Sequence, residues 1–179
     1  GDPGLFESGT LTITAADLLA NDSDVEGDVL TVTGIDTSGL TGAASFANGE
    51  IVYDTNGKYE TLAAGETVHD SFGYTISDGA GGTDTATVTI TVNGENDAPV
   101  ALDDSVGADE SGPAISIDVL ANDSDVDSGA LLTLSALDTS GTAGAASVVN
   151  GEIVYDPNGK FAALSAGVTA LDTFTYTVT

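Results

Sequence analysis

Carboxylates recur at alternate positions in one short segment of the chain, Asp22-Ser23-Asp24-Val25-Glu26-Gly27-Asp28. Hard cations such as Ca²⁺ prefer about six to eight oxygen ligands from a loop that can bend, and a glycine permits a sharp turn. Two interpretations stay open. The segment is either a Ca²⁺-binding loop or a turn built from Asp, Ser and Gly, which favour turns in any case.

A second copy of this loop begins 101 residues later at Asp123-Ser124-Asp125 and keeps an acid at Asp127, whereas Ala130 stands where the first copy has Asp28. The spacing resembles the opening of an EF-hand loop. That loop, however, ends on a glutamate and is flanked by helices, whereas Thr33 occupies the corresponding position and strand-like sequence follows. An EF-hand is therefore excluded.

The net charge of the chain limits its partners. The 29 acidic residues face only two lysines, which gives a formal net charge of −27. Lys58 and Lys160 cannot form a basic patch, so nucleic acid and anionic membrane surfaces are not expected partners. Two carboxylates about 10 Å apart in water repel by ~0.4 kcal/mol. The folded chain therefore needs salt or bound cations, and composition alone does not separate plain solubility from divalent-cation binding.

Long internal repetition divides the chain. Segments such as Gly49-Glu50-Ile51-Val52-Tyr53-Asp54 recur 102 residues later as Gly151-Glu152-Ile153-Val154-Tyr155-Asp156. A period near 100 residues indicates independent domains, not solenoid units. We expect a first repeat over residues 1–97 that lacks its opening segment and a second over residues 98–179 that lacks its last strand. The offset between the two repeats changes from 101 to 102 residues between Val126 and Leu131. This one-residue insertion predicts a surface loop there.

Alternating threonine and aliphatic residues in 85–92 predict a half-buried strand. Asn-Gly and Asp-Gly pairs separate this strand from weaker runs of the same kind, and Asp78-Gly79-Ala80-Gly81-Gly82 predicts a hairpin. About seven short strands per repeat indicate an all-β protein of tandem immunoglobulin-like sandwiches. Short helical turns are expected at 15–19 and 62–65. The other expected strands are 11–14, 29–35, 50–54, 71–77, 114–118, 131–137, 152–156 and 173–179.

The segment between the repeats, residues 93–104, is short, acidic and rich in side-chain oxygens. A flexible linker would be rich in Gly and Ser. This one is either a solvated linker or a segment that a cation holds straight. A hydrolytic triad is not expected, because the single histidine, His69, is replaced by Ala170 in the second repeat. The chain is therefore not expected to be an enzyme.

Several segments of the sequence resemble those of a known family. Residues 62–67, Ser77-Asp78-Gly79, 85–92 and Asn96-Asp97-Ala98-Pro99 are similar to the VCBS repeat. The two Leu-Ala-Asn-Asp-Ser-Asp-Val segments, with Asp103-Asp104, are similar to its relative, the bacterial cadherin-like tandem repeat. The resemblance implies cadherin-like β-sandwiches that bind Ca²⁺ and stand in long arrays in large secreted adhesins of the repeats-in-toxin type, at the bacterial cell surface.

The resemblance extends by analogy to the cadherins of animals, and it implies the metal ligands. Asn96 and Asp97 would meet Asp123 and Asp125 at the junction between the repeats. Asp103 and Asp104, which belong to the resemblance, are further candidate ligands. Glu7, Asp22 and Asp24 would face the junction before Gly1. The linker is one residue shorter than the cadherin pattern, so one or two ions are expected per junction in place of three.

Two functions from different classes are therefore weighed. The first is a Ca²⁺-stiffened structural extender that spaces ligand-binding domains from the cell, with neighbouring repeats as its main partners and homophilic or polysaccharide contacts as further ones. The alternative is an accessory module that binds polysaccharide or protein. The absence of Trp counts against the alternative, because sugar sites usually display exposed aromatic rings. No run of about 18 apolar residues is present, so membrane insertion is not expected.

Overall fold

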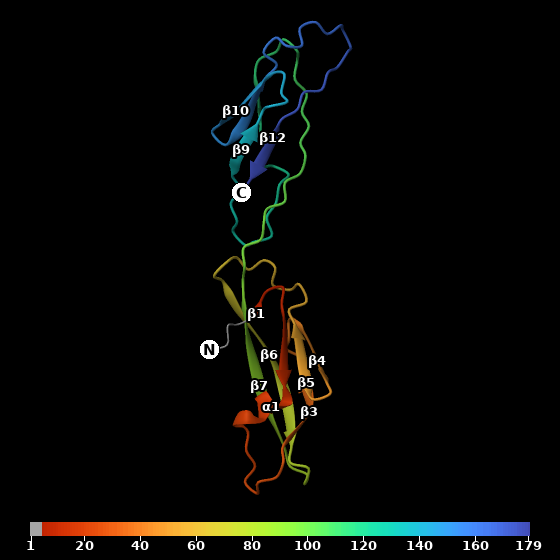
Figure 1. Ribbon diagram of the computed structural model, residues 1–179, viewed down its shortest axis with the longest axis vertical. Helices are drawn as coiled ribbons and strands as arrows, with labels where there is room; N and C mark the ends of the chain where they lie inside the picture. The colour runs from red at the N-terminus through yellow and green to blue at the C-terminus, as the bar shows by residue number, and fades with distance from the viewer. Residues whose placement is uncertain (1–4) are drawn as a thin grey trace. The chain divides into compact units, whose positions relative to one another are not determined.

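The computed structural model describes residues 5–179, and it divides into two compact units, residues 1–96 and residues 97–179 (Figure 1). Each unit has its own hydrophobic core. The regular secondary structure of both units is almost wholly strand, and the longest helix among residues 5–179 has four residues. The all-β class expected from the sequence is confirmed.

The first unit is a sandwich of two sheets with seven strands. One sheet has the order β1-β7-β6-β3 and the other the order β2-β5-β4. Strand β1 runs parallel to β7, and the other neighbours are antiparallel. Its strands are β1 (Leu5–Phe6), β2 (Thr10–Thr14), β3 (Thr31–Asp36), β4 (Ala43–Ala47), β5 (Glu50–Asp54), β6 (Thr67–Ser77) and β7 (Thr83–Asn93).

Side chains from both sheets fill the space between them in the first unit. Ile51 and Tyr53 of β5 are fully buried, and they meet Phe72 and Tyr74 of β6 in one cluster. The alternation predicted for β7 places Ile90 and Val92 in this core, while the neighbouring Thr89 and Thr91 are exposed and half-buried. Phe72 and Tyr74 are therefore core residues of the first unit.

The second unit repeats this plan with fewer strands. Its sheets have the orders β10-β11-β8 and β12-β9. Within residues 97–179 the structure therefore has five strands, fewer than the seven or so expected for each repeat. The core is smaller and centres on Val119, Ile153 and Tyr155. The strands are β8 (Ile115–Ile117), β9 (Leu134–Asp138), β10 (Ala145–Val149), β11 (Glu152–Asp156) and β12 (Thr175–Val178).

The sequence patterns missed three strands. Strands β4 and β10 begin with two alanines, which have low β propensity, so neither segment showed a strand signal. Strand β1 is too short to alternate. The helical turn expected at 15–19 is confirmed as α1 (Ala15–Leu18), which Thr14 caps together with Asp17. The turn expected at 62–65 is not helical, and Gly65 there has a positive φ of 87°.

The turn predictions are confirmed where Asn-Gly pairs close hairpins. Asn48 and Gly49 have φ values of 55° and 80°, the left-handed conformation that a two-residue hairpin between β4 and β5 requires. Asn150 and Gly151 repeat this geometry. The hairpin predicted at 78–82 joins β6 to β7, and the Asp78 Oδ1 atom accepts the backbone N–H groups of three successive residues there.

Candidate functional site

The acidic loop of the second unit is fixed to the segment that opens that unit. Val100 and Ser124 form an isolated antiparallel bridge, with N···O distances of 2.7 and 3.0 Å. This bridge places residues 97–104 beside residues 122–127. We call these two segments together the acidic base of the second unit. The structure thus brings together two of the sequence segments that were expected to supply cation ligands.

At one end of the acidic base, three aspartates are linked in series. The Asp97 backbone N–H donates to Asp127 Oδ2 at 3.0 Å, and the Asp127 N–H donates to Asp125 Oδ1 at 2.9 Å. Asp127 is only 8% exposed. Backbone donors therefore hold two carboxylates in place within a loop whose sequence has no positive charge.

At the other end, Asp123 and Asp104 are held by different donors. The Leu102 N–H donates to Asp123 Oδ1 at 2.8 Å, and Asn122 Nδ2 donates to the carbonyl oxygen of Asp103 at 3.3 Å. The Tyr176 hydroxyl lies 2.9 Å from Asp104 Oδ2, to which it can donate.

The negative charges around Tyr176 affect its pKa. Burial raises the pKa of Tyr176, and the hydrogen bond to Asp104 with the charges of Asp104, Asp123 and Asp103 raises it further. Three carboxylates therefore act on one hydroxyl group. Because like charges repel at short range, a cation bound near them would lower the free energy of this region.

Two carboxylate oxygens of the acidic base fit a bound cation. Asp123 Oδ2 and Asp127 Oδ1 are buried, and neither accepts a hydrogen bond from any residue between 5 and 179. A buried anionic oxygen without a donor is costly, and a hard cation such as Ca²⁺ is a partner that removes this cost. Within the same described range, no three Asp, Glu, His or Cys side chains gather closely enough to hold a metal ion by themselves. An ion here would therefore need oxygens of other kinds as well.

The loop of the first unit has a different arrangement. Tyr74, the counterpart of Tyr176, donates to Asp22 Oδ2 at 3.1 Å, and the Asp28 N–H donates to Asp24 Oδ1 at 3.0 Å. The middle of the loop is open, because Val25 is 97% exposed. In the first unit Asp22 therefore accepts the tyrosine hydrogen bond that Asp104 accepts in the second unit.

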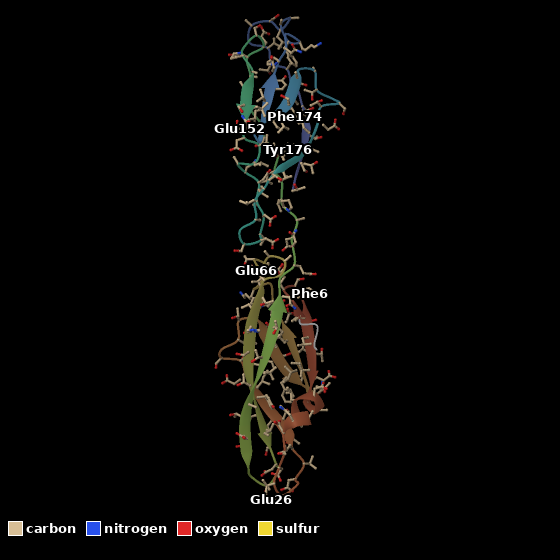
Figure 2. The ribbon with its side chains drawn as sticks, turned by 90° about the vertical axis from the view of Figure 1, so that its left-hand side faces the viewer. Phe6, Glu26, Glu66, Glu152, Phe174 and Tyr176 are labelled. Atoms are coloured by element: carbon tan, nitrogen blue, oxygen red, sulfur yellow. The ribbon has the colours of Figure 1, made fainter. Side chains whose placement is uncertain are left out.

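Glu7 lies far from Asp22 and Asp24, although the three were expected to face the same junction. The Glu7 N–H donates to the Asn93 carbonyl, and Glu7 Oε1 accepts from the Glu95 N–H at 3.3 Å. Asn93 pairs with Thr67, whereas Asp22 is bonded to Tyr74, seven residues further along β6 or roughly 23 Å. Figure 2 shows the same separation, with Phe6 at one end of the first unit and Glu26 at the other.

The physical reason is the direction of β2. This strand carries the chain away from the end of the sandwich at which Glu7 lies, before α1 and the loop at Asp22 begin. The expected group of Glu7, Asp22 and Asp24 is therefore corrected: Glu7 belongs with the segment that ends the first unit. Asn96 is the last residue of that unit and is exposed.

Two further acidic residues were not among the expected cation ligands. Asp127 was seen in the loop but not proposed as a ligand, because burial is invisible in the sequence. Glu110 is the counterpart of Glu7, since Glu-Ser-Gly recurs and the turns match: the Gly9 N–H donates to the Phe6 carbonyl, and the Gly112 N–H to the Asp109 carbonyl. That short recurrence was the signal that could have identified Glu110.

An aspartate forms a further polar centre in each unit, buried in the first unit and partly exposed in the second. The Asp70 carboxylate is 4% exposed and accepts from the Tyr53 and Tyr59 hydroxyls at 2.9 and 2.6 Å. The N–H groups of Thr41, Gly42 and Ser71 also donate to it. Burial acts to raise the pKa of Asp70, but the hydrogen bonds, led by that from Tyr59, outweigh it and lower the pKa to about 2.

Asp172 repeats this centre with one donor fewer. It accepts from the Tyr155 hydroxyl at 2.7 Å and from the N–H groups of Ala143, Gly144 and Thr173. Phe161 stands where the first unit has Tyr59. Since every donor around Asp70 and Asp172 is a backbone amide or a tyrosine with a raised pKa, these centres stabilise loops and show no feature of acid–base catalysis.

His69 lies on the exposed face of β6, with its Nδ1 atom 3.2 Å from Thr91 Oγ1. This contact joins two neighbouring strands and involves no nucleophile–base pair with a third orienting group. The shift of 102 residues between the repeats makes Leu171 the counterpart of His69, so the expected pairing of His69 with Ala170 is corrected; no histidine stands at either position. In the part of the chain that the structure describes, no helix is both long and apolar enough to cross a membrane.

The comparisons with known proteins agree with the repeat. A family model described as a bacterial cadherin-like domain matches residues 4–94 and again residues 96–179. A search of curated proteins finds no significant match. The family match covers both units, and each match includes one acidic loop and one aspartate centre.

Proposed function

Because the chain belongs to the bacterial cadherin-like domain family, we propose that it is a Ca²⁺-stiffened extender module of a large bacterial surface adhesin. Domains of this family are structural repeats of extracellular proteins, and they generally bind calcium. In the proposed role, the module spaces ligand-binding domains from the cell, and its main partners are neighbouring repeats of the same polypeptide. A catalytic role is not proposed.

The observation that carries the proposal is the pair of buried oxygens in the acidic base, Asp123 Oδ2 and Asp127 Oδ1. They lie in the loop that is bonded to residues 97–104, which open the second unit. A cation at these oxygens, with Asp97 and Asp125 beside them, would hold the opening segment against the body of the unit. The stiffening would therefore act on a segment that a plain solvated linker would leave mobile.

The alternative function, a module that binds polysaccharide or protein, has less support. Carbohydrate sites use exposed aromatic rings, but the aromatic side chains of the first unit mostly serve its core. Tyr53, Tyr59, Phe72 and Tyr74 are all buried there.

Thermal unfolding of the whole chain with excess Ca²⁺ and with chelator tests the extender role. At a hundredfold excess over the dissociation constant, one site adds about 2.7 kcal/mol to the free energy of unfolding. A sodium chloride sample of equal ionic strength separates specific binding from screening of the net charge of −27. Small-angle scattering of the same samples measures length and its spread.

Asp127→Asn is the variant that probes the site, and Glu26→Gln is its matched control. Glu26 occupies the same loop position in the first unit and is exposed. We expect Asp127→Asn to reduce the Ca²⁺-dependent rise in melting midpoint, with Glu26→Gln having little effect. Equal midpoints in Ca²⁺ and in matched sodium chloride, with equal scattering lengths, would reject the proposal.

A further inference from the structure

Strand β4 lies at one edge of its sheet in the first unit (Figure 1), and among residues 5–179 it pairs only with β5. A two-residue turn at 48–49 follows it, so Ala47 and Glu50 form a hydrogen-bonded pair. Because such pairs alternate along an antiparallel ladder, Ala44 and Phe46 direct their N–H and C=O groups away from β5. The free edge of β4 therefore offers donors and acceptors to a further strand.

The second unit has the same free edge. Strand β10 pairs only with β11 in the described part of the chain, and each of its pairs corresponds to a β4 pair after a shift of 102 residues. The edge strands of the other sheets, β3 and β9, have an irregular register and end on an aspartate. Both features hinder pairing with a further strand, and neither β4 nor β10 has them.

The segments that contain these two edges are uncharged. Residues 37–49 and 139–151 have no Asp, Glu, Lys or Arg, and they are the two longest such stretches of the sequence. Two copies of a chain with a net charge of −27 repel each other, so they approach most easily where carboxylates are absent. A basic partner would instead be attracted to surfaces rich in carboxylates. The distribution of charge therefore favours a second copy of the chain at this edge.

The sequence of β4 is suited to pairing with itself. In an antiparallel pair centred on Ser45, Ala44 exchanges hydrogen bonds with Phe46 of the second copy, and Phe46 with the second copy's Ala44. Ser45 then lies opposite the same serine, and Ala43 opposite Ala47, with Cα atoms about 4.5 Å apart. These three side chains are exposed and small, so they fit this close spacing.

The nearest carboxylates tolerate such a pairing. Glu50 lies opposite Ala47, and Asp54 lies opposite Ala43, on β5. In the paired copies, Glu50 of one chain and Asp54 of the other are three strand spacings apart, or about 14 Å. This separation exceeds the screening length of about 8 Å at physiological salt, so their repulsion is largely screened.

We propose that this edge pairs antiparallel with the same edge of a second copy of the chain, β4 with β4 and β10 with β10. One contact consists of two hydrogen-bonded residue pairs and little buried surface, so a single edge should bind weakly. Because the edge recurs in each unit, chains that engage several edges at once gain avidity. The contact is independent of any cation, since no carboxylate takes part in it.

Cysteine substitutions test the pairing, because the chain has no cysteine of its own. Ser45→Cys is compared with Thr12→Cys, since both residues are exposed and pair with Val52, but Thr12 lies on the opposite edge strand, β2. In a glutathione redox mixture, Ser45→Cys should form disulfide-linked dimers at least about tenfold faster, because its Cα spacing suits a disulfide. Ser147→Cys and Ser116→Cys give the same comparison in the second unit.

Two further measurements test the register. Ala43→Cys mixed with Ala47→Cys should give linked heterodimers faster than either variant links to itself, because antiparallel pairing sets position 43 opposite position 47. In the original chain, the amides of Ala44 and Phe46 should exchange more slowly as its concentration is raised. An extended basic peptide, Lys-Thr-Val-Thr-Lys, is added to a dilute sample as the competing occupant.

Each outcome bears on the proposal. Equal linking rates for Ser45→Cys and Thr12→Cys would overturn it, and so would self-linking of Ala43→Cys that is as fast as its linking to Ala47→Cys. Slower amide exchange with the basic peptide, but not at raised chain concentration, would show that a foreign strand occupies the edge and would overturn it as well. All measurements are made in Ca²⁺ and in chelator, so that this pairing and the Ca²⁺-dependent extender role can fail separately.

Discussion

Asp70-Ser71-Phe72-Gly73-Tyr74 in the first unit and Asp172-Thr173-Phe174-Thr175-Tyr176 in the second have nearly the same side chains. In the first unit this stretch lies inside β6, whereas in the second only its last two residues belong to β12. The residues that lose their strand structure are those that pair with β7 alone in the first unit. Whether this stretch forms a strand therefore depends more on a neighbouring strand that pairs with its backbone than on its own sequence.

The aspartate at the start of this stretch behaves differently in the same comparison. Asp172 keeps the amides of Ala143 and Gly144 and the Tyr155 hydroxyl, although the strand around it is absent. These donors come from the other sheet and from the loop before β10, so they do not depend on β7. The aspartate centre is thus a property of each repeat, and its strength differs through one residue, Tyr59 against Phe161.

The largest expected effect comes from removing the charge of the centre. Asp70→Asn should lower the free energy of unfolding of the first unit by about 3 kcal/mol, because buried donors lose a charged acceptor. Asp172→Asn should cost the second unit about 1–2 kcal/mol, since Asp172 is more exposed and has one donor fewer. Amide exchange at Ile51 and Ile153, both fully buried, reports the two cores separately. Equal losses in the two units would contradict the comparison.

A smaller loss is expected from adding one methyl group at Gly42. A Cβ atom there would lie 2.6 Å from the Asp54 carbonyl oxygen and 2.8 Å from the Tyr53 hydroxyl oxygen. Gly42→Ala should therefore cost about 2 kcal/mol in denaturant unfolding, and Gly144→Ala should act in the same way in the second unit. Gly39→Ala is the control, because nothing lies within 4 Å of its added Cβ. A loss of the same size at Gly39 would remove the steric explanation.

The pH dependence of the first unit should reveal Asp70. Its pKa in the folded chain, about 2, is below the ordinary value of 3.8, so ionised Asp70 stabilises the fold above about pH 4. This contribution, about 2 kcal/mol, is lost as the pH falls from about 4 through 2. It is measured as the difference between the original chain and Asp70→Asn in urea unfolding at several pH values. A difference that stays constant across this range would show that the pKa of Asp70 is not lowered.

The smallest expected effect comes from exchanging the one residue by which the two aspartate centres differ. Tyr59→Phe removes the 2.6 Å hydrogen bond to Asp70 and should cost the first unit about 1.5 kcal/mol. Phe161→Tyr offers Asp172 the missing donor and should stabilise the second unit by about 0.5–1 kcal/mol. Exchange at Ile51 and Ile153 again separates the units. If Phe161→Tyr has no effect, the lost hydroxyl does not explain the weaker centre.

The sequence was most informative where one local rule acts alone. The alternating pattern of 85–92 correctly predicted β7, and Asn48-Gly49 and Asn150-Gly151 correctly predicted turns. It was least informative for β4 and β10, because alanines carry little strand signal and these strands form by pairing with β5 and β11. The candidate site was predicted in part: the acidic loops were identified, but the burial of Asp127 was not.

What the sequence determined by itself was the repeat, the all-β class, the excess of negative charge and the acidic segments, since each of these depends on residue types and their spacing along the chain. Only the tertiary structure decided which acids meet. Strand β2 carries Glu7 away from Asp22, and the bridge between Val100 and Ser124 brings the opening segment of the second unit to its acidic loop. The reason is that a carboxylate's neighbours are set by strand direction and sheet pairing, which join residues far apart in sequence.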